Sequence, residues 1–311
     1  MTTATAETPP SRERSVALAL LFVMPLFFST NIIFGRASID GGHTEPYTLA
    51  FLRWTFTALI LLPFVWPKLR THRALIGSLT PTIAMLGFLG MWICGALVYV
   101  ALKYTSATNG TLIYTTAPVM VLVIDWLFRG RKTNIREAAG IGLAFSGVGI
   151  IVFRGSLETL LSLSFNVGDL IFVATAFSWA VYSVWLKSDK LAPLQTLPLF
   201  ALTAGAGAVL LLPFAAFETV SLATFPSTLT AWALISATVI ISSLLAFSLF
   251  QNGVRVVGSS ITSIFLYLLP VYGVALAVLF LGETLFPFHF WGIATVLSGV
   301  VLATFPARKK A

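Results

Sequence analysis

Residues 107–153 read ATNGTLIYTTAPVMVLVIDWLFRGRKTNIREAAGIGLAFSGVGIIVF. Two apolar runs, 107–128 and 137–153, stand on either side of the basic segment Arg129-Gly130-Arg131-Lys132. A helix that crosses the hydrocarbon core of a bilayer needs about 20 mainly apolar residues. The stretch therefore predicts two membrane-spanning helices joined by a short, positively charged loop.

The rest of the chain repeats this pattern. Of its 311 residues, 58% are hydrophobic and 10% are charged, whereas soluble domains carry about 25% charged residues. A soluble protein of this composition would expose large apolar patches to water. The apolar runs of spanning length are 16–35, 47–66, 81–101, 107–128, 137–153, 169–186, 194–216, 229–251, 259–281 and 287–305. The sequence thus predicts an all-α integral membrane protein with ten transmembrane helices.

Basic residues are distributed unevenly over the loops. With the tail 1–15 placed inside, fifteen of the 19 Lys and Arg residues lie on the inner side and three on the outer side, while Arg53 lies within a span. Cytoplasmic loops are enriched in Lys and Arg. We therefore expect the tails 1–15 and 306–311 to be cytoplasmic. This topology also accounts for the net charge of +8 without a nucleic-acid partner.

The two halves of the chain resemble each other. Shifting residues 101–153 by 152 positions gives eleven identities without a gap. Prolines and glycines impose backbone features, so their coincidence is more informative than that of apolar residues. The matched pairs of this kind include Pro118 with Pro270, Gly140 with Gly292, and Gly147 with Gly299. We divide the chain into a first repeat, 16–153, an extracytoplasmic connection, 154–168, and a second repeat, 169–305.

Each half would contain five spans, and because five is odd the second half must enter the membrane in the opposite orientation. Inverted repeats are typical of secondary transporters, whose substrate site lies near the bilayer midplane between the repeats. We therefore expect two inverted five-helix repeats around a central cavity. The glycines spaced at 140 and 147, and at 292 and 299, predict sites of close helix packing.

Several motifs carry a resemblance to a known family. They are PYTLAFLR at Pro46–Arg53, ALKYTSATNG at Ala101–Gly110 followed by Ala117-Pro118-Val119, Leu281-Gly282-Glu283-Thr284, and the Ser-Gly pairs at 146–147 and 298–299. The chain resembles the drug/metabolite transporter superfamily in its ten-helix EamA-type branch, and within it the YddG-like exporters of aromatic amino acids. One departure is that Gly130-Arg131-Lys132 stands where the family often has Gly-Glu.

The resemblance implies a secondary transporter that exports small amphipathic metabolites by alternating access, with aromatic and other neutral amino acids as the first candidates. A multidrug or lipophilic-cation carrier and a sugar-type carrier are alternatives, because the fold alone does not determine the substrate. An intramembrane enzyme fits less well, since the three histidines fall in loops or at span ends without a metal-binding mate. A channel would need a ring of like charges or a carbonyl filter, usually from several subunits. No Walker A sequence is present, so ATP does not drive transport directly. The resemblance also implies a bacterial-type inner (plasma) membrane as the location. We expect a small-molecule substrate and the lipid bilayer as partners, with no cofactor and no metal; the oligomeric state stays open.

The energy source is a separate question. By the predicted boundaries, Asp125 lies near the inner end of a span and Asp169 near the outer end of another. Proton- or sodium-coupled carriers usually place a carboxylate near the substrate site. The sequence therefore favours downhill export, or coupling through some other group.

Polar and aromatic side chains within the spans are the candidate site residues, because such groups are costly in lipid. Trp92 and Trp179 lie in mid-span, and Thr175, Ser178 and Tyr182 share a helix face with Trp179. The expected substrate contacts are Asn31, Trp92, Tyr99, Thr111, Tyr114, Thr115, Ser178, Trp179, Tyr182, Ser263 and Tyr267. Interhelical hydrogen bonding and core packing are the alternative roles. At Pro25, Pro118 and Pro270 we expect helix bends, which act in gating or are static.

Arg53 lies about two turns inside the second span. It would either attract a substrate carboxylate or serve a structural purpose, by snorkelling outward or pairing with Asp40 or Glu45. The structural role is the one that we expect from the sequence.

Overall fold

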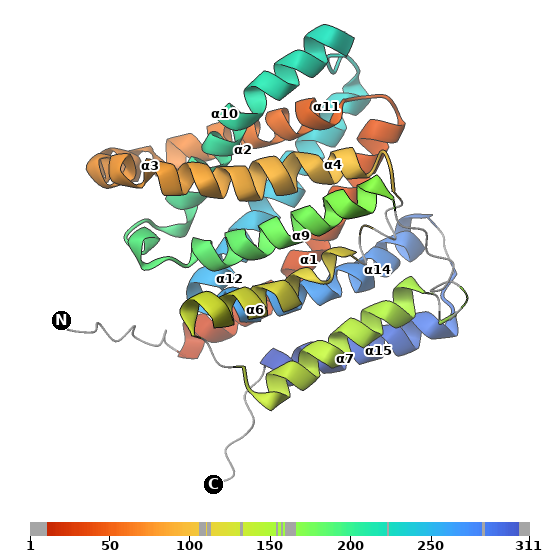
Figure 1. Ribbon diagram of the computed structural model, residues 1–311. Helices are drawn as coiled ribbons and strands as arrows, with labels where there is room; N and C mark the ends of the chain where they lie inside the picture. Colours follow the sequence, from red (N-terminus) through yellow and green to blue (C-terminus); the bar gives the residue numbers. More distant parts are fainter. Residues whose placement is uncertain are drawn as a thin grey trace, which may run out of the picture.

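The computed structural model describes residues 11–105, 110, 113–130, 133–153, 155–156, 158, 166–222, 224–281 and 284–304. Helices make up the described secondary structure, and no strand occurs among these residues. The helices run roughly parallel or antiparallel to one another in a bundle (Figure 1).

The first half of the chain forms long helices. Their bounds are α1 Ser11–Asp40, α2 Pro46–Thr71, α3 Arg73–Gly87, η1 Phe88–Leu97, α4 Val98–Ala101, α6 Ala117–Arg129 and α7 Ile135–Val152. The segments α3, η1 and α4 follow one another without a break, and η1 is a π-helix.

The second half follows the same plan. Its elements are α9 Val167–Leu186, η2 Asp189–Leu191, α10 Thr196–Leu222, α11 Leu229–Ala237, η3 Thr238–Leu245, α12 Ala246–Val256, α13 Ser259–Ile264, η4 Phe265–Leu268, α14 Leu269–Leu281 and α15 Pro287–Thr304. A π-helix, η3, again lies within the third long helix of the half, between α11 and α12.

Nine helices in the described part of the chain are long and apolar enough to cross a membrane. They correspond to nine of the ten predicted runs. The tenth run, 107–128, falls partly on residues outside the described part, where the described helix α6 begins only at Ala117. The prediction of a helical membrane protein is thus confirmed, whereas the number ten stays a prediction.

The outer surface of the bundle is apolar. Large hydrophobic side chains face outward along the helices, such as Phe64 on α2, 75% exposed, and Val220 on α10, 82% exposed. Isolated exposed apolar residues are ordinary in soluble proteins, but a surface on which they recur along many helices needs a lipid cover. The exposed apolar residues therefore agree with the spans found from helix length and composition.

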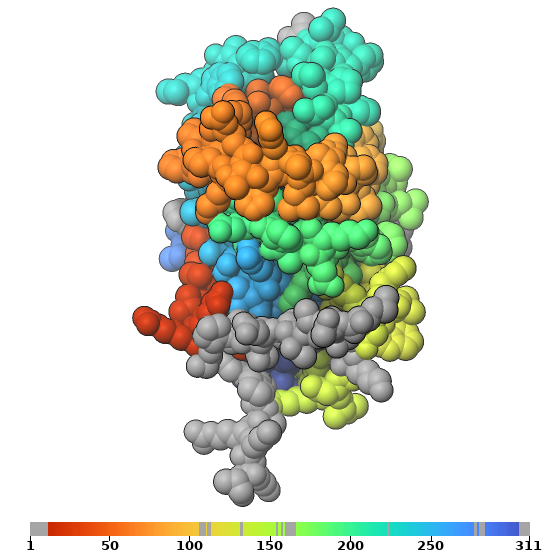
Figure 2. Space-filling view, turned by 90° about the vertical axis from the view of Figure 1, so that its left-hand side faces the viewer, coloured from red at the N-terminus to blue at the C-terminus, as the bar shows by residue number. Residues whose placement is uncertain are grey.

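The connections gather at the two ends of the bundle. Figure 2 views the end at which α1 begins, and shows there the orange surface of α2 and α3, the green surface of α9 and the blue surface of α12. We call this the α1-start end, and the opposite end, where α1 finishes at Asp40, the α1-finish end.

Glycines allow α7 and α15 to pack closely along one edge of the bundle (Figure 1). A Cβ atom on Gly140 would lie 2.6 Å from the backbone nitrogen of Ala303, and one on Gly147 would lie 2.6 Å from that of Val296. Backbone atoms have little freedom to move aside, so these positions need glycine. The predicted packing role of these glycines is confirmed.

A carboxylate from far along the chain completes the beginning of α2. Its N-cap residue, Glu45, makes no side-chain capping bond. Instead, Glu218 near the end of α10 accepts hydrogen bonds from the backbone nitrogen of Thr48, at 2.8 Å, and from the Thr48 hydroxyl, at 3.1 Å. Glu218 therefore acts as a helix cap supplied by another helix, at the end where the helix dipole favours a negative charge.

Removing this cap should weaken the packing of α2 against α10. We expect Glu218→Ala to lower the free energy of unfolding by about 1 kcal/mol, the usual cost of a lost N-cap, measured by thermal unfolding in detergent. Glu45→Ala is the matched control, because Glu45 makes an ion pair with Lys103 across two partly exposed side chains, and such pairs contribute little. Equal effects of the two substitutions would contradict the capping role.

Candidate functional site

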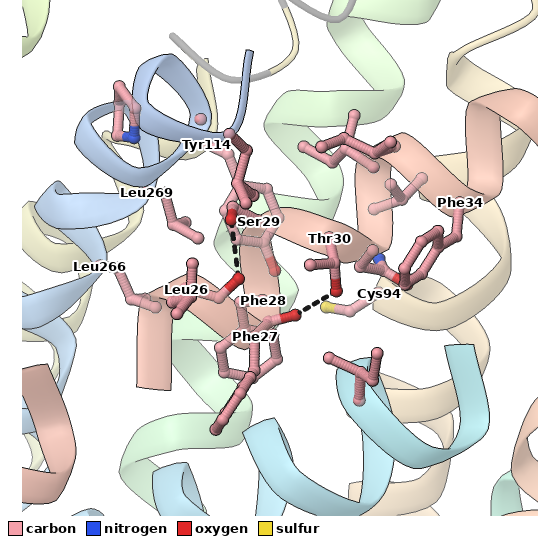
Figure 3. Close-up of a pocket in the computed structure, with 18 of the residues that line it drawn as sticks. Leu26, Phe27, Phe28, Ser29, Thr30, Phe34, Cys94, Tyr114, Leu266 and Leu269 are labelled. Atoms are coloured by element: carbon pink, nitrogen blue, oxygen red, sulfur yellow. Dashed lines mark hydrogen bonds between the residues drawn. The ribbon is translucent and has the colours of Figure 1, made fainter. Parts of the chain in front are cut away.

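A cavity of about 800 Å³ lies inside the bundle. Nine consecutive residues of α1, 26–34, contribute to its wall, so that α1 passes along the cavity and presents more than one face to it. Figure 3 shows this segment in the middle of the site, with Leu266 and Leu269 on one side and Cys94 on the other. The remaining lining residues are Arg53, Val98, Tyr114, Phe172, Trp179, Ile241, Phe247, Pro270, Gly273 and Leu276.

Hydroxyl groups of α1 are bonded within the protein. Ser29 donates to the carbonyl oxygen of Leu26 at 2.8 Å, and Thr30 donates to that of Phe27 at 2.7 Å (Figure 3). The Thr30 hydroxyl also lies 2.9 Å from that of Ser242 on η3. These bonds reduce the polarity that the hydroxyls present to the cavity. The surface of the cavity is consequently mostly apolar.

Aromatic rings form one part of the wall around Trp179 of α9. The Trp179 ring centroid lies 5.7 Å from that of Phe28, 5.5 Å from that of Phe247 and 4.6 Å from that of Phe250. Tyr114 adds a further ring at 6.3 Å. Edge-to-face and tilted arrangements at these separations are favourable for aromatic pairs. The rings thus hold one another in a fixed cage, which we call the Trp179 cage and define by these five residues. Four of them line the cavity, and the fully buried Phe250 supports Trp179 from behind.

The indole nitrogen of Trp179 is a buried donor without a hydrogen-bond partner among the described residues. The side chain is almost fully buried, with 2% of the residue exposed. A buried donor that makes no hydrogen bond costs about 1–3 kcal/mol, so most buried donors are satisfied. The Trp179 side chain lines the cavity, while its indole nitrogen is buried.

Among the described residues that line the cavity, Arg53 of α2 is the charged one. It is 2% exposed. Its Nε donates to the Ser243 hydroxyl at 2.6 Å, and its Nη1 donates to Asn31 Oδ1 at 2.9 Å and to the Tyr99 hydroxyl at 3.0 Å. Its Nη2 donates to the carbonyl oxygen of Ser242 at 3.2 Å.

The structural role expected for Arg53 is wrong in both of its forms. The side chain is buried, so it does not snorkel to the membrane surface. Asp40 pairs instead with Arg36 at 2.8 Å, and Glu45 pairs with Lys103 at 2.5 Å. The guanidinium points into the bundle because the side-chain oxygens of Asn31 on α1, Tyr99 on α4 and Ser243 on η3 accept its hydrogen bonds there.

The two π-helices both supply backbone acceptors to α2. The Ser242 carbonyl of η3 accepts from Arg53, and the Met91 carbonyl of η1 accepts from the Trp54 indole nitrogen at 3.1 Å. Single π-helical turns are rare and occur frequently at functional sites. Arg53 and Trp54, which are adjacent on α2, therefore donate hydrogen bonds to π-helical segments of two different helices, one from each half of the chain.

The sequence-predicted site residues fall into four groups. Asn31, Tyr114 and Trp179 line the cavity, as does Pro270. Tyr99 lies behind the wall, where its hydroxyl donates to Asn31 Oδ1 at 2.7 Å and accepts from Arg53. Thr111 lies outside the described residues.

Other predicted residues are not among those that line the cavity. Trp92 stacks on Phe88 at 5.3 Å, Ser178 donates to the Leu89 carbonyl at 3.0 Å, and Tyr182 accepts from Gln251 at 2.8 Å. Thr115, Ser263 and Tyr267 are buried as well, and Tyr267 faces Phe145 of α7 at 6.5 Å between ring centroids.

The three prolines differ in their setting. Pro25 lies inside α1, which continues as a helix through it. Pro118 lies in the first turn of α6, where a missing N–H has no intrahelical partner to lose. Pro270 follows the 3₁₀ segment η4 and lies in the first turn of α14. Pro118 therefore stands at the beginning of α6, whereas Pro270 lies within the single apolar span Ser259–Leu276, directly after its 3₁₀ segment. The bends at the three prolines stay predictions.

A contact between the two halves lies toward the α1-start end. Asp125 of α6 accepts hydrogen bonds from the hydroxyls of Ser260, at 2.7 Å, and Ser259, at 3.2 Å, at the beginning of α13. Arg129 lies 3.8 Å from the same carboxylate. Within the second half, Gln251 of α12 donates to the Tyr182 hydroxyl of α9. No cluster of His, Cys, Asp and Glu that could hold a metal occurs among the described residues.

A bundle of apolar helices of spanning length, with an internal cavity whose wall includes the buried Arg53, is the architecture of a multi-pass membrane protein. The model of the EamA-like transporter family matches the chain twice, over residues 15–153 and 166–305. The chain belongs to the EamA-like transporter family.

Similar proteins and folds agree with this assignment. An uncharacterized transporter of Archaeoglobus fulgidus is 30% identical over 287 residues, which cover 92% of this chain and 96% of that protein. The uncharacterized transporter YyaM of Bacillus subtilis is 28% identical over 290 residues, 91% of this chain and 93% of its own length. A solved crystal structure shares the fold with a TM-score of 0.74 at 19% identity, over 93% of this chain and 96% of that chain.

These findings confirm the predicted transporter class and the EamA-type family. The names of these relatives state no substrate. The resemblance to YddG-like exporters and the export of aromatic amino acids therefore stay predictions.

Proposed function

We propose that this chain is a secondary transporter that carries small amphipathic molecules with a flat aromatic body, and that aromatic amino acids, then other neutral amino acids, are the first substrates to test. The observation that carries the proposal is the Trp179 cage on the wall of the cavity. Its rings offer faces and edges to a planar apolar group, while Arg53 and Asn31 offer polar groups to the other part of the molecule.

The size of the cavity supports a metabolite-sized substrate. A volume of about 800 Å³ falls within the roughly 300–1,000 Å³ of small-molecule sites. The mostly apolar wall favours a molecule with an aromatic body over a sugar, which would need many more hydrogen-bonding partners.

Alternating access between two inverted repeats is part of the proposal. It is supported by the double match of the family model and by π-helices within the third long helix of each half. The hydrogen bonds of Asp125 join α6 of the first half to α13 of the second half near the α1-start end, and we propose that transport breaks them. We place this end in the cytoplasm of a bacterial-type inner membrane; a relative from Salmonella typhimurium, 26% identical, is called an inner membrane transporter.

Uptake into proteoliposomes tests the proposed function. Labelled phenylalanine or tryptophan should enter with saturable kinetics and show counterflow, because a carrier exposes a single site alternately to the two sides. Unlabelled threonine, a sugar and a lipophilic cation serve as competitors. If the cation or the sugar competes and aromatic compounds do not, the substrate is a cation or a sugar and the proposed aromatic substrate is wrong. Ion flux that does not saturate would indicate a channel instead of a carrier.

A further inference from the structure

We propose that Arg53 is the receptor for an anionic group of the substrate, so that the cavity selects aromatic monoanions over the corresponding zwitterions and rejects aromatic cations. The inference rests on the proposed function in taking the cavity as the substrate site. It goes further by assigning the charge of the substrate from groups that the wall holds.

The first step is the missing counter-ion. The ion pairs between described residues join Arg36 to Asp40, Lys103 to Glu45 and Arg129 to Asp125, and none includes Arg53. The described acidic residues are absent from the wall of the cavity. A buried charge without a partner is strongly unfavourable, so the site is incomplete as a purely structural arrangement.

The second step is the kind of group that surrounds the guanidinium. Its four described acceptors are an amide oxygen, two hydroxyl oxygens and a backbone carbonyl, all of them neutral. They fix the orientation of the guanidinium without cancelling its charge. Cation–π contacts also hold the guanidinium in place, because its carbon lies 4.4 Å from the ring centroid of Trp54 and 5.6 Å from that of Phe247.

The third step is the donor capacity that remains. A guanidinium carries five N–H donors, and four of them have described acceptors, which leaves one on Nη2. Arg53 lines the cavity, and the surrounding wall is apolar, so an anion there would interact through a low local dielectric. A carboxylate of the substrate can accept a hydrogen bond from the remaining Nη2–H and, at the same time, neutralise the charge of Arg53.

The fourth step concerns a positive group on the substrate. Asn31 Oδ1 already accepts two hydrogen bonds, from Arg53 and from Tyr99. The described wall contains no carboxylate for an ammonium group. An amino acid would therefore bring its ammonium close to a fixed positive charge without an acidic partner, whereas an aromatic monoanion would not. The Trp179 cage would hold the ring of either molecule.

Binding of four probes with similar aromatic bodies to the purified chain in nanodiscs tests the proposal. The probes are 3-phenylpropionate, phenylalanine, 3-phenylpropanol and 3-phenylpropylamine, and quenching of tryptophan fluorescence reports binding. We expect the propionate to bind at least about tenfold more tightly than the amine, since charge-assisted hydrogen bonds are stronger than neutral ones. Equal affinities for the propionate and the amine would overturn the proposal without any substitution being needed.

Substitutions then assign the preference to Arg53. In Arg53→Gln the preference for the propionate over the amine should fall to within about twofold, while Arg53→Lys should keep part of it because the charge remains. Thermal unfolding checks that each variant is folded, and Arg36→Gln is the matched control, because Arg36 pairs with Asp40 at the surface. A folded Arg53→Gln that retained the full preference would refute the assignment.

Transport of the same probes separates this inference from the proposed function. Saturable uptake of aromatic probes without any preference for the anion would refute the anion receptor and leave the aromatic carrier intact. Anion-selective binding without saturable uptake of any probe would refute the carrier and leave the receptor intact.

Discussion

Trp179→Ala should raise the KM for saturable aromatic uptake at least about tenfold. The substitution removes the ring at the centre of the Trp179 cage, which lies within 5.7 Å of the rings of Phe28, Phe247 and Phe250. Loss of one well-packed aromatic contact with a ligand exceeds about 1.4 kcal/mol at binding hot spots, which corresponds to a factor of ten in affinity. Initial rates in proteoliposomes over a range of substrate concentrations measure the effect.

Two further variants give this experiment its specificity. Trp179→Phe keeps a ring in the cage, so uptake should fall much less than in Trp179→Ala. Trp92→Ala removes a tryptophan of the third span that stacks on Phe88 and is not among the residues that line the cavity, so its KM should stay within about twofold. A Trp92→Ala effect as large as that of Trp179→Ala would show that the ring at 179 has no special contact with the substrate.

Gly147→Leu should destabilise the whole chain, because it separates α7 from α15. A side chain at 147 would begin 2.6 Å from the backbone nitrogen of Val296 and 2.8 Å from the carbonyl oxygen of Gly292. Neither atom can move without shifting a helix, and overpacking costs about 1–3 kcal/mol or more. We expect a lower temperature of unfolding and less monodisperse protein after purification in detergent.

Gly142→Leu is the matched control on the same helix. A Cβ atom at 142 meets no atom within 4 Å, so the leucine side chain has room. The gain in helix propensity, up to about 1 kcal/mol for replacing glycine in a helix interior, is shared by both variants. The difference between the two unfolding temperatures therefore isolates the packing of α7 on α15, and a difference of zero would contradict the close approach.

Helix positions were predictable from the sequence because apolar runs of spanning length are long and strongly contrasted with their loops. The run 229–251 corresponds to the span Leu229–Val256, and the run 137–153 to Ile135–Val152. The helix at the second run extends to Thr71, beyond the end of its apolar run at residue 66, since Lys68 and Arg70 continue it with good helix propensity. Gly140 and Gly147 were predictable as packing positions because few residues other than glycine permit such contacts.

The environment of Arg53 was not predictable in the same way. Its acceptors are separated from it by 22, 46 and 190 positions in the chain, and nothing local to the second span indicates them. Ser242 and Ser243 read as two small polar residues in an apolar run, and only the π-helix around them reveals their carbonyl and hydroxyl as partners. The one available signal was the presence of an arginine inside a span, which favours function by default.

The aromatic residues were predicted as a class but not individually. Trp92 and Trp179 both lie in mid-span, and periodicity alone gives no measure of which faces the cavity and which faces a neighbouring helix. Their neighbours decide this. Trp179 meets rings from α1 and α12 across the centre of the bundle, whereas Trp92 meets Phe88 of its own helix and Phe214 of α10.

The course of α1 along the cavity has a consequence for how this scaffold diversifies. Nine adjacent codons specify residues 26–34, which form the largest continuous part of the wall. Exchanging this short cassette between homologous carriers would alter many ligand contacts at once and leave the glycine-mediated helix pairing untouched. A library confined to these codons is therefore an economical route to new selectivity.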